Sequence, residues 1–263
     1  MVVQNRPDPT LPLVSLEVIR GAADRISPIV RNTPLVEVSC PSGERLFLKC
    51  ENLQVGGAFK IRGAYNMISQ LDDDQRRRGV ITYSSGNHGQ AVAIASKSLA
   101  APAVIVMPTT APVIKVEGTK QHGAEVIFEG TTSVERRRRA EAEAAARGLT
   151  MVPPFDHASI IAGQGTVGLE IVHQCPEVST VLVQIGGGGL ISGVAAAIKQ
   201  WRPSVRVLGV EPVGAAKMKA SIEAGHPVTL ENTSSIADGL LPLRPGDLPF
   251  AHVQAFVDGI VTV

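Results

Sequence analysis

The sequence predicts an α/β protein in which helices cover both faces of a parallel sheet. From Gly79 onward, short runs rich in β-branched residues alternate with alanine-rich stretches of helical length. Of the 263 residues, 44% are hydrophobic and 19% are charged, which provides ample apolar material for a core. Such alternation is typical of βαβ units, whose parallel strands are buried on both sides.

The expected elements follow one another without an internal repeat. Strands are predicted from apolar runs at 80–84, 103–108, 124–130 and 204–212, and a strand followed by a glycine loop at 179–189. Helices are predicted between them at 89–100, 111–123, 133–148 and 190–201. The helix "SVERRRRAEAEAAARG" should close at Gly148, because glycine readily adopts the left-handed conformation that ends a helix.

Composition argues against several classes of function. A formal net charge of +1 and an aromatic content of 3% argue against nucleic acid or an anionic membrane as the main partner. The three cysteines, Cys40, Cys50 and Cys175, form no CxxC pair, so buried thiols are expected rather than a disulfide framework or a zinc site. The start of the chain has no signal-peptide pattern and no apolar run reaches membrane-spanning length, so a cytoplasmic protein is expected.

The first candidate site is the glycine loop in "QIGGGGLISG". Ligands of parallel α/β sheets bind at the carboxyl ends of strands, and this loop ends a strand and opens a helix. Glycines let backbone N–H groups close on an anion, and the helix N-terminus adds partial positive charge, so phosphate is the expected guest. The spacing fits neither the dinucleotide fingerprint nor a P-loop. The alternative is a tight turn without a ligand.

The second candidate site is "YSSGNHGQAVA", which joins another strand to another helix. Hydroxyl groups, an amide and exposed N–H groups at a helix start suit a carboxylate. The alternative is a plain helix cap formed by Ser85 or Asn87. His88 is expected to be a structural histidine rather than a metal ligand, since no partner stands at ligand spacing.

The third candidate is Lys60, in the stretch "ENLQVGGAFKIRGAYNMI". A lysine buried beside Phe59 has its charged form disfavoured, so its pKa falls and its amine becomes available as nucleophile or base. The alternative is a lysine whose stem packs while its ammonium reaches water.

A reactive lysine, a carboxylate-binding loop and a phosphate-binding loop together suit pyridoxal phosphate and an amino acid. The segments "GGAFKIRGAYN", "SSGNHGQAVA", "PPFDHASIIAGQGT" and "QIGGGGLISG" resemble the fold-type II pyridoxal-phosphate enzymes, specifically the threonine/serine dehydratase and serine racemase group. The resemblance implies the two-domain open parallel-sheet fold of the tryptophan synthase β-like enzymes. A small domain at 79–152 would interrupt a large cofactor domain at 1–78 plus 153–263, with the cofactor in the cleft between them.

The resemblance also implies roles for individual residues. Lys60 would form the imine with the cofactor and later move the Cα proton, Phe59 would lie beside the cofactor ring, and Asn87 would hydrogen-bond its 3′-oxygen. The phosphate would be bound by the four loop glycines, Gly186, Gly187, Gly188 and Gly189. The substrate carboxylate would be held by the loop residues Ser84, Ser85, Gly86, Asn87 and His88.

The reaction implied by the resemblance is dehydration of L-threonine or L-serine to a 2-oxo acid and ammonia, in a homodimer. In a serine racemase, Ser85 would return a proton on the face of the substrate opposite Lys60. Dehydration of 3-hydroxyaspartate stays open as well, because the pocket for the side chain carries no motif.

One departure from the family pattern concerns a metal. In the racemase-like branch, a carboxylate stands six residues after the glutamate of "GVEP", and the pair helps to bind a divalent cation. Here Lys217 holds that position after Glu211, so no divalent metal site is expected, and the ammonium could sit where the cation would. This favours a dehydratase over a racemase. The place of Glu211 beyond the glycine loop also leaves a nicotinamide oxidoreductase as a weaker alternative.

The other departure is the end of the chain at "FVDGIVTV". Members of the group continue for several dozen residues, which add core and a residue that contacts the pyridine nitrogen. Without such a unit we expect exposed apolar surface, and without a regulatory domain we do not expect the feedback-controlled type of threonine dehydratase. A chain that binds the cofactor weakly or not at all is the non-enzymatic alternative.

Overall fold

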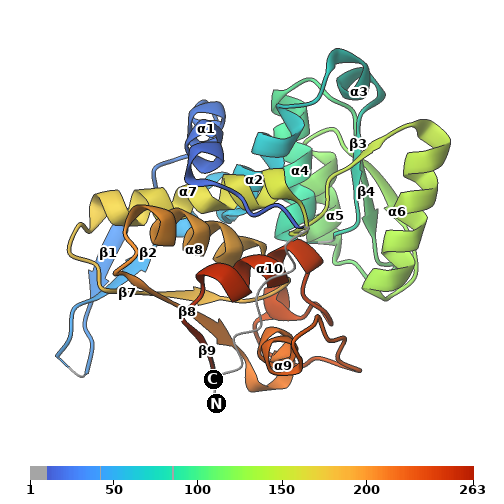
Figure 1. Ribbon diagram of the computed structural model, residues 1–263. Helices are drawn as coiled ribbons and strands as arrows, with labels where there is room; N and C mark the ends of the chain where they lie inside the picture. Colours follow the sequence, from blue (N-terminus) through green and yellow to red (C-terminus); the bar gives the residue numbers. More distant parts are fainter. Residues whose placement is uncertain (1–10, 42, 85) are drawn as a thin grey trace.

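The computed structural model describes residues 11–41, 43–84 and 86–263 (Figure 1). Within these residues the strands form a parallel four-stranded sheet in the order β5-β4-β3-β6 and a parallel three-stranded sheet in the order β7-β8-β9. An antiparallel hairpin of β1 (Leu35–Val38) and β2 (Leu46–Lys49) completes the strands. The predicted α/β class with parallel sheets is therefore confirmed.

The two central strands of the four-stranded sheet, β3 and β4, are buried on both faces. The strands of this sheet are β3 (Val80–Thr82), β4 (Ala103–Met107), β5 (Glu125–Phe128) and β6 (Thr150–Met151). Around it lie α3 (Asp73–Arg78), α4 (Asn87–Ser98), α5 (Val113–Lys120) and α6 (Ser133–Arg147). Ile105 and Met107 pack in the cluster that contains α4, whereas Val104 and Val106 pack against α6. Burial on both faces explains why β4 is a continuous apolar run.

The three-stranded sheet consists of β7 (Thr180–Gln184), β8 (Arg206–Glu211) and β9 (Gly259–Thr262). The remaining helices are α1 (Leu16–Ile26), α2 (Lys60–Ile68), α7 (Ala158–Gln174), α8 (Gly189–Trp201), α9 (Lys217–Ala224) and α10 (Asp247–Phe256). On the inner face, Val181 and Val183 pack with α8. On the opposite face, Leu182 and Val261 are 58% and 44% exposed, so apolar surface is exposed there.

Helix α7 lies between α2 and α8, and glycines allow the close approach. A Cβ atom added at Gly163 would lie 2.6 Å from the carbonyl oxygen of Arg62 in α2. One added at Gly193 of α8 would lie 2.3 Å from the carbonyl oxygen of Ile161 in α7. Real Cβ atoms are not found at such distances, so these contacts require glycine. Helix α7 thus fixes the helix that begins with Lys60 relative to the helix that follows the glycine loop.

The predicted element ends are accurate to a few residues. Helix α6 ends at Gly148, which has the left-handed conformation expected of it. No helix of the described segments is both long and apolar enough to cross a membrane. Of the cysteines only Cys175 is buried, whereas Cys40 and Cys50 are partly exposed, so the expectation of buried thiols is correct for one of the three.

The division into two domains stays a prediction. The four-stranded sheet lies between residues 80 and 151, inside the range proposed for the small domain. One buried apolar cluster, however, combines Ile61 and Ile68 of α2 with Val80 and Ile105 of that sheet.

Candidate active site

Lys60 is the first residue of α2 and follows the turn Val55–Gly57. Its amine donates a hydrogen bond of 2.6 Å to the carbonyl oxygen of Pro154 and lies 5.3 Å from the centroid of the Phe59 ring. No carboxylate of the described residues forms an ion pair with it, and although the residue is only partly buried, desolvation lowers the pKa of Lys60 to about 8. The amine therefore loses its proton more readily than an ordinary lysine. Because it binds an internal carbonyl, an ammonium that simply reaches water is not supported.

The loop before α4 contains Ser84 and Gly86 and leads to Asn87, and none of these described residues caps the helix with its side chain. Gly86 is the N-cap residue and Asn87 is the first helical residue, exposed to solvent, so the interpretation of Asn87 as a plain cap is wrong. Ser84 accepts a hydrogen bond of 3.4 Å from the backbone N–H of Gly86. Ser85 lies outside the described residues. No side chain of the described residues caps the first N–H groups of α4, which suits an anion such as a carboxylate.

His88 is buried one residue further into α4, with 3% of its surface exposed. Its Nε2 lies 3.0 Å from the carbonyl oxygen of Val152, and because a carbonyl only accepts, Nε2 carries the proton and donates it. Burial, with a further contribution from the charge of Lys60, lowers the pKa of His88 to about 3, so the ring is neutral. Its Nδ1 is buried without a hydrogen-bond partner among the described residues.

The glycine loop links β7 to α8. Gly188 is the N-cap of α8, has φ +100° and provides no side-chain cap. A side chain there is strained, which explains one of the glycines. A Cβ atom at Gly187 would lie 2.2 Å from the Phe155 ring, and one at Gly189 would lie 3.0 Å from Phe155. The loop therefore leaves the first N–H groups of α8 available to an anion, and its sequence cannot change without moving Phe155.

The segment 152–155, which follows β6, joins these parts. The carbonyl oxygen of Val152 binds His88, that of Pro154 binds Lys60, and Phe155 packs against the glycine loop. No sequence pattern had assigned a role to these three residues, although Pro154 and Phe155 lie in the quoted segment "PPFDHASIIAGQGT". Their position just after a strand was the available signal, because the carboxyl ends of parallel strands meet at one edge.

Comparison with known proteins identifies the family, and the match includes the residues described above. A family model described as "Pyridoxal-phosphate dependent enzyme" matches residues 26–263. The chain belongs to this family.

Relatives of two kinds resemble this pyridoxal-phosphate-dependent enzyme equally well. A serine racemase of Oryza sativa subsp. indica is 45% identical over 248 residues, which cover 93% of this chain and 73% of the relative. An L-threonine ammonia-lyase of Thermotoga maritima is 43% identical over 254 residues, which cover 95% of this chain and 63% of the relative. The chain therefore spans about two thirds to three quarters of these relatives.

Solved structures confirm the fold. Maize serine racemase has a TM-score of 0.91 and 43% identity, with 96% of this chain and 77% of that chain covered. The processed form of threonine deaminase isoform 2 from Solanum lycopersicum also has a TM-score of 0.91, with 38% identity and 100% of this chain and 75% of that chain covered. The predicted family and its tryptophan synthase β-like fold are confirmed.

The residues of this enzyme fit pyridoxal phosphate in three respects. The Lys60 amine has one carbonyl partner and a lowered pKa, so it can react with an aldehyde. The glycine loop meets an uncapped helix start with a left-handed Gly188, which suits a phosphate. The unpartnered Nδ1 of His88 leaves a buried acceptor in the same region. Lys60 and the glycine loop are thus the residues that would hold the cofactor.

A buried charge network fixes the start of α2. The Arg62 side chain has no exposed surface and donates to Glu51 at 2.7 and 2.8 Å, to Glu170 at 2.6 and 2.9 Å and to Thr166 at 3.0 Å. Burial alone would lower the pKa of Arg62, but the hydrogen bonds to the two glutamates outweigh it and raise the pKa. Arg62 stands two residues after Lys60, so the network holds the backbone that carries the reactive amine.

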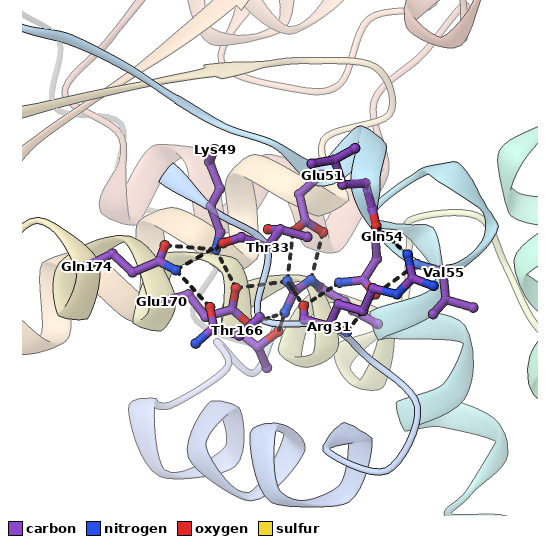
Figure 2. A network of polar contacts seen from close by, with 12 residues as sticks. Arg31, Thr33, Lys49, Glu51, Gln54, Val55, Thr166, Glu170 and Gln174 are labelled. Carbon is purple, nitrogen blue, oxygen red and sulfur yellow. Dashed lines mark hydrogen bonds and ion pairs between the residues drawn. The ribbon is translucent and has the colours of Figure 1, made fainter. Parts of the chain in front are cut away.

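The network extends to the N-terminal part of the enzyme (Figure 2). Lys49 lies 2.6 Å from Glu170, and its ammonium also donates to the carbonyl oxygen of Thr33 and to Gln174. Two cations, Lys49 and Arg62, thus balance two carboxylates, Glu51 and Glu170. An arginine in the apolar stretch "AFKIRGAY" was the sequence signal for this network, because a buried guanidinium needs carboxylate partners.

Glu211 does not have the environment of a ribose-binding acid. It is fully buried at the end of β8, and its two carboxylate oxygens accept the backbone N–H groups of Met218 at 3.0 Å and Lys219 at 2.9 Å. Its oxygens are therefore used at the start of α9, which together with the family match excludes the oxidoreductase alternative.

Proposed function

We propose that this chain is a pyridoxal-phosphate-dependent dehydratase of hydroxy amino acids, which converts L-threonine or L-serine to a 2-oxo acid and ammonia. The observation that carries the proposal is the contact of the segment 152–155 with Lys60, with the start of α4 and with the glycine loop. A reactive amine and two helix starts suited to anions are the parts needed for an amino acid and a phosphate-bearing cofactor. Pyridoxal phosphate, when bound, withdraws electrons from the Cα atom of its amino acid.

Lys60 is the proposed base at Cα. Proton transfer is most effective when the pKa of the base lies near the working pH, and its pKa of about 8 meets that condition. Its hydrogen bond to Pro154 holds the amine at the edge of the sheet where ligands of this fold class bind.

The start of α4 is the proposed carboxylate site. Its first N–H groups, which no side chain of the described residues caps, and the partial positive charge of the helix favour an anion there, and the hydroxyl of Ser84 adds a donor. Gly86 lets the chain turn into the helix, and Asn87 is exposed and so within reach of a ligand. His88 supports the site as a neutral ring held by Val152.

The glycine loop is the proposed phosphate site, through the N–H groups at the start of α8. Phe59 is proposed to lie beside the cofactor ring and Asn87 to bind its 3′-oxygen, both from the family resemblance. Ser85 is proposed, from the resemblance alone, to lie on the face of the substrate opposite Lys60.

Serine racemase activity is the second candidate, because the serine racemase of Oryza sativa subsp. indica is as similar as the threonine ammonia-lyase of Thermotoga maritima. Lys217 in place of a carboxylate favours the dehydratase. Measuring 2-oxo acid and D-serine formed from L-serine separates the two, and 3-hydroxyaspartate should be tested as a third substrate.

The first test is the visible absorbance of the protein mixed with pyridoxal phosphate, compared with Lys60→Ala and with the control Lys219→Ala. We expect the absorbance of lysine-bound cofactor in the wild type and the control but not in Lys60→Ala, followed by release of 2-oxo acid on addition of L-threonine. A folded wild type without this absorbance would favour the non-catalytic alternative.

A homodimer, a cytoplasmic location and the two-domain division stay proposals. The family resemblance supports the dimer and the domains, and the sequence pattern of the N-terminus supports the location. Sedimentation analysis, cell fractionation and limited proteolysis near residues 79 and 152 test them in turn.

A further inference from the structure

Lys217 is buried among oxygen atoms beside the glycine loop. Its ammonium donates to the carbonyl oxygens of Ile185 at 3.0 Å, Ala215 at 2.9 Å and Leu240 at 3.0 Å. The Oε1 atom of Glu211 lies 3.3 Å away. Neither Lys217 nor Glu211 has exposed surface. We call these four oxygen atoms the oxygen cage.

The oxygen cage is suited to a cation. An ammonium has three N–H donors and no lone pair, which matches three carbonyl acceptors, and Glu211 provides the opposite charge. A neutral amine would turn a lone pair toward one of the oxygens. Desolvation lowers the pKa of Lys217, and Glu211 opposes this shift. The partners thus offset the cost of burying the charge.

The four oxygens come from segments that surround the glycine loop. Ile185 directly precedes Gly186, and Glu211 ends β8. Ala215 ends the short helix Val213–Ala215, and Leu240 ends the short helix Asp238–Leu240, whose Gly239 carbonyl packs against Gly186. One cation therefore joins the end of β7, the end of β8 and the 238–240 turn.

A divalent cation does not fit these residues as they stand. Carboxylate and carbonyl oxygens are the ligands that Mg²⁺ and Ca²⁺ prefer, at about 2.0–2.1 Å and about 2.3–2.6 Å. The cage oxygens lie 2.9–3.3 Å from Nζ, which suits an ammonium, and that ammonium occupies the position a free ion would need.

We propose that the oxygen cage is a cation site whose permanent occupant is the Lys217 ammonium. The end of β7 and the glycine loop are then held in place without a free metal ion. Removing the ammonium should leave a cage that takes a small free cation instead. This proposal concerns folding and ligand binding, so it holds whether or not the proposed reaction is found.

The first experiment is thermal unfolding of the wild-type protein with EDTA, with Mg²⁺ and with Ca²⁺ at millimolar concentration. We expect the Tm to stay within about 1 °C, because the cage is already filled. A Tm that rises by several degrees with either ion, or that falls with EDTA, would overturn the proposal. This measurement needs no variant, so it decides even if substitution prevents folding.

The second experiment empties the cage. Lys217→Ala should lower the Tm by about 10 °C, since a buried carboxylate loses its partner. Ethylammonium, which supplies the missing group, should restore part of that loss. The matched control is Lys219→Ala, two residues along the same helix and partly exposed, which should show neither change. A Lys217→Ala protein as stable as the control, or one that does not respond to ethylammonium, contradicts the proposal.

The third experiment replaces the ammonium by a carboxylate. Lys217→Asp should have a Tm that rises by several degrees with Mg²⁺, because two carboxylates and three carbonyl oxygens then line the cage. Lys219→Asp should not respond. If the Lys217→Asp protein ignores Mg²⁺ and Ca²⁺, the cage is not a cation site.

Discussion

Two lysines of this protein, the partly buried Lys60 and the fully buried Lys217, have opposite environments. The amine of Lys60 binds one carbonyl oxygen and no carboxylate of the described residues. The amine of Lys217 binds three carbonyl oxygens and lies beside Glu211. Both lose the hydration that stabilises an ammonium, but only Lys217 has that loss replaced by oxygen atoms of the protein. The number of oxygen partners thus separates a reactive lysine from a structural one.

Arg62 is a third cation to compare, and it is fully buried. It stands two residues after Lys60, yet its guanidinium is held by two carboxylates. The same short helix therefore begins with a cation that is poorly compensated and continues with one that is fully compensated. The compensated residue fixes the backbone, and the uncompensated residue is left for chemistry.

The largest expected effect is on catalysis at Lys60. Lys60→Ala should lower 2-oxo acid release by about 10³-fold or more, because the proposed base and the cofactor attachment are both removed. Steady-state kinetics of the folded variant beside Lys219→Ala measure this. If Lys60→Ala kept an activity within tenfold of the wild type, the number of oxygen partners of a lysine would not identify the reactive one.

The next effect is on stability at Arg62. Arg62→Met should lower the free energy of unfolding by about 3–5 kcal/mol, because the partly buried Glu51 and Glu170 lose their shared, fully buried partner. Urea unfolding measures it, with Arg45→Met as the control, since Arg45 pairs with Glu37 and Glu177 on the surface and should show no measurable loss. Equal losses in the two variants would contradict the assigned role.

A smaller effect is expected when Lys217 is made to resemble Lys60. Glu211→Gln should lower the free energy of unfolding at pH 7 by about 2–3 kcal/mol, since the ammonium loses its counter-charge. The pKa of Lys217 in the folded state should fall further, so the unfolded state binds more protons and stability should rise with pH more steeply than in the wild type. Unfolding at pH 7 and pH 9.5 tests this, with the exposed Glu223→Gln as control. If stability rose with pH equally steeply in Glu211→Gln and in the wild type, Glu211 would not be the counter-charge of Lys217.

The smallest effect is the pH dependence of amine labelling without cofactor. The rate at Lys60 should rise about tenfold per pH unit and level off near pH 8, its lowered pKa, whereas an ordinary lysine levels off near pH 10.4. Because this pKa lies below the unfolded value, Lys60 disfavours folding below about pH 8, and the penalty disappears as the pH rises toward the unfolded pKa. Peptide mass spectrometry after brief labelling measures the labelling rates of Lys60 and Lys217 in the same sample. Faster labelling of Lys217 would reverse the comparison.

The sequence by itself determined the fold class and the approximate ends of the elements that it predicts, although it did not predict helix α7 or the strands β1, β2 and β9. Apolar periodicity predicts strands such as β4 and helices such as α8, because each depends on residues close in the chain. The glycine loop and Lys60 were also found, since glycine at a strand end and a lysine in apolar company are local signals. The family resemblance followed from the order of those motifs.

Only the tertiary structure decided which groups surround each buried cation. The partners of Lys217 are mostly backbone carbonyls, which every residue has, so no sequence pattern distinguishes Ile185, Ala215 and Leu240 from their neighbours. In the same way, Pro154 reaches Lys60 across 94 positions of sequence. A carbonyl becomes a ligand only when folding turns it toward a charge, and that depends on packing between elements far apart in the chain.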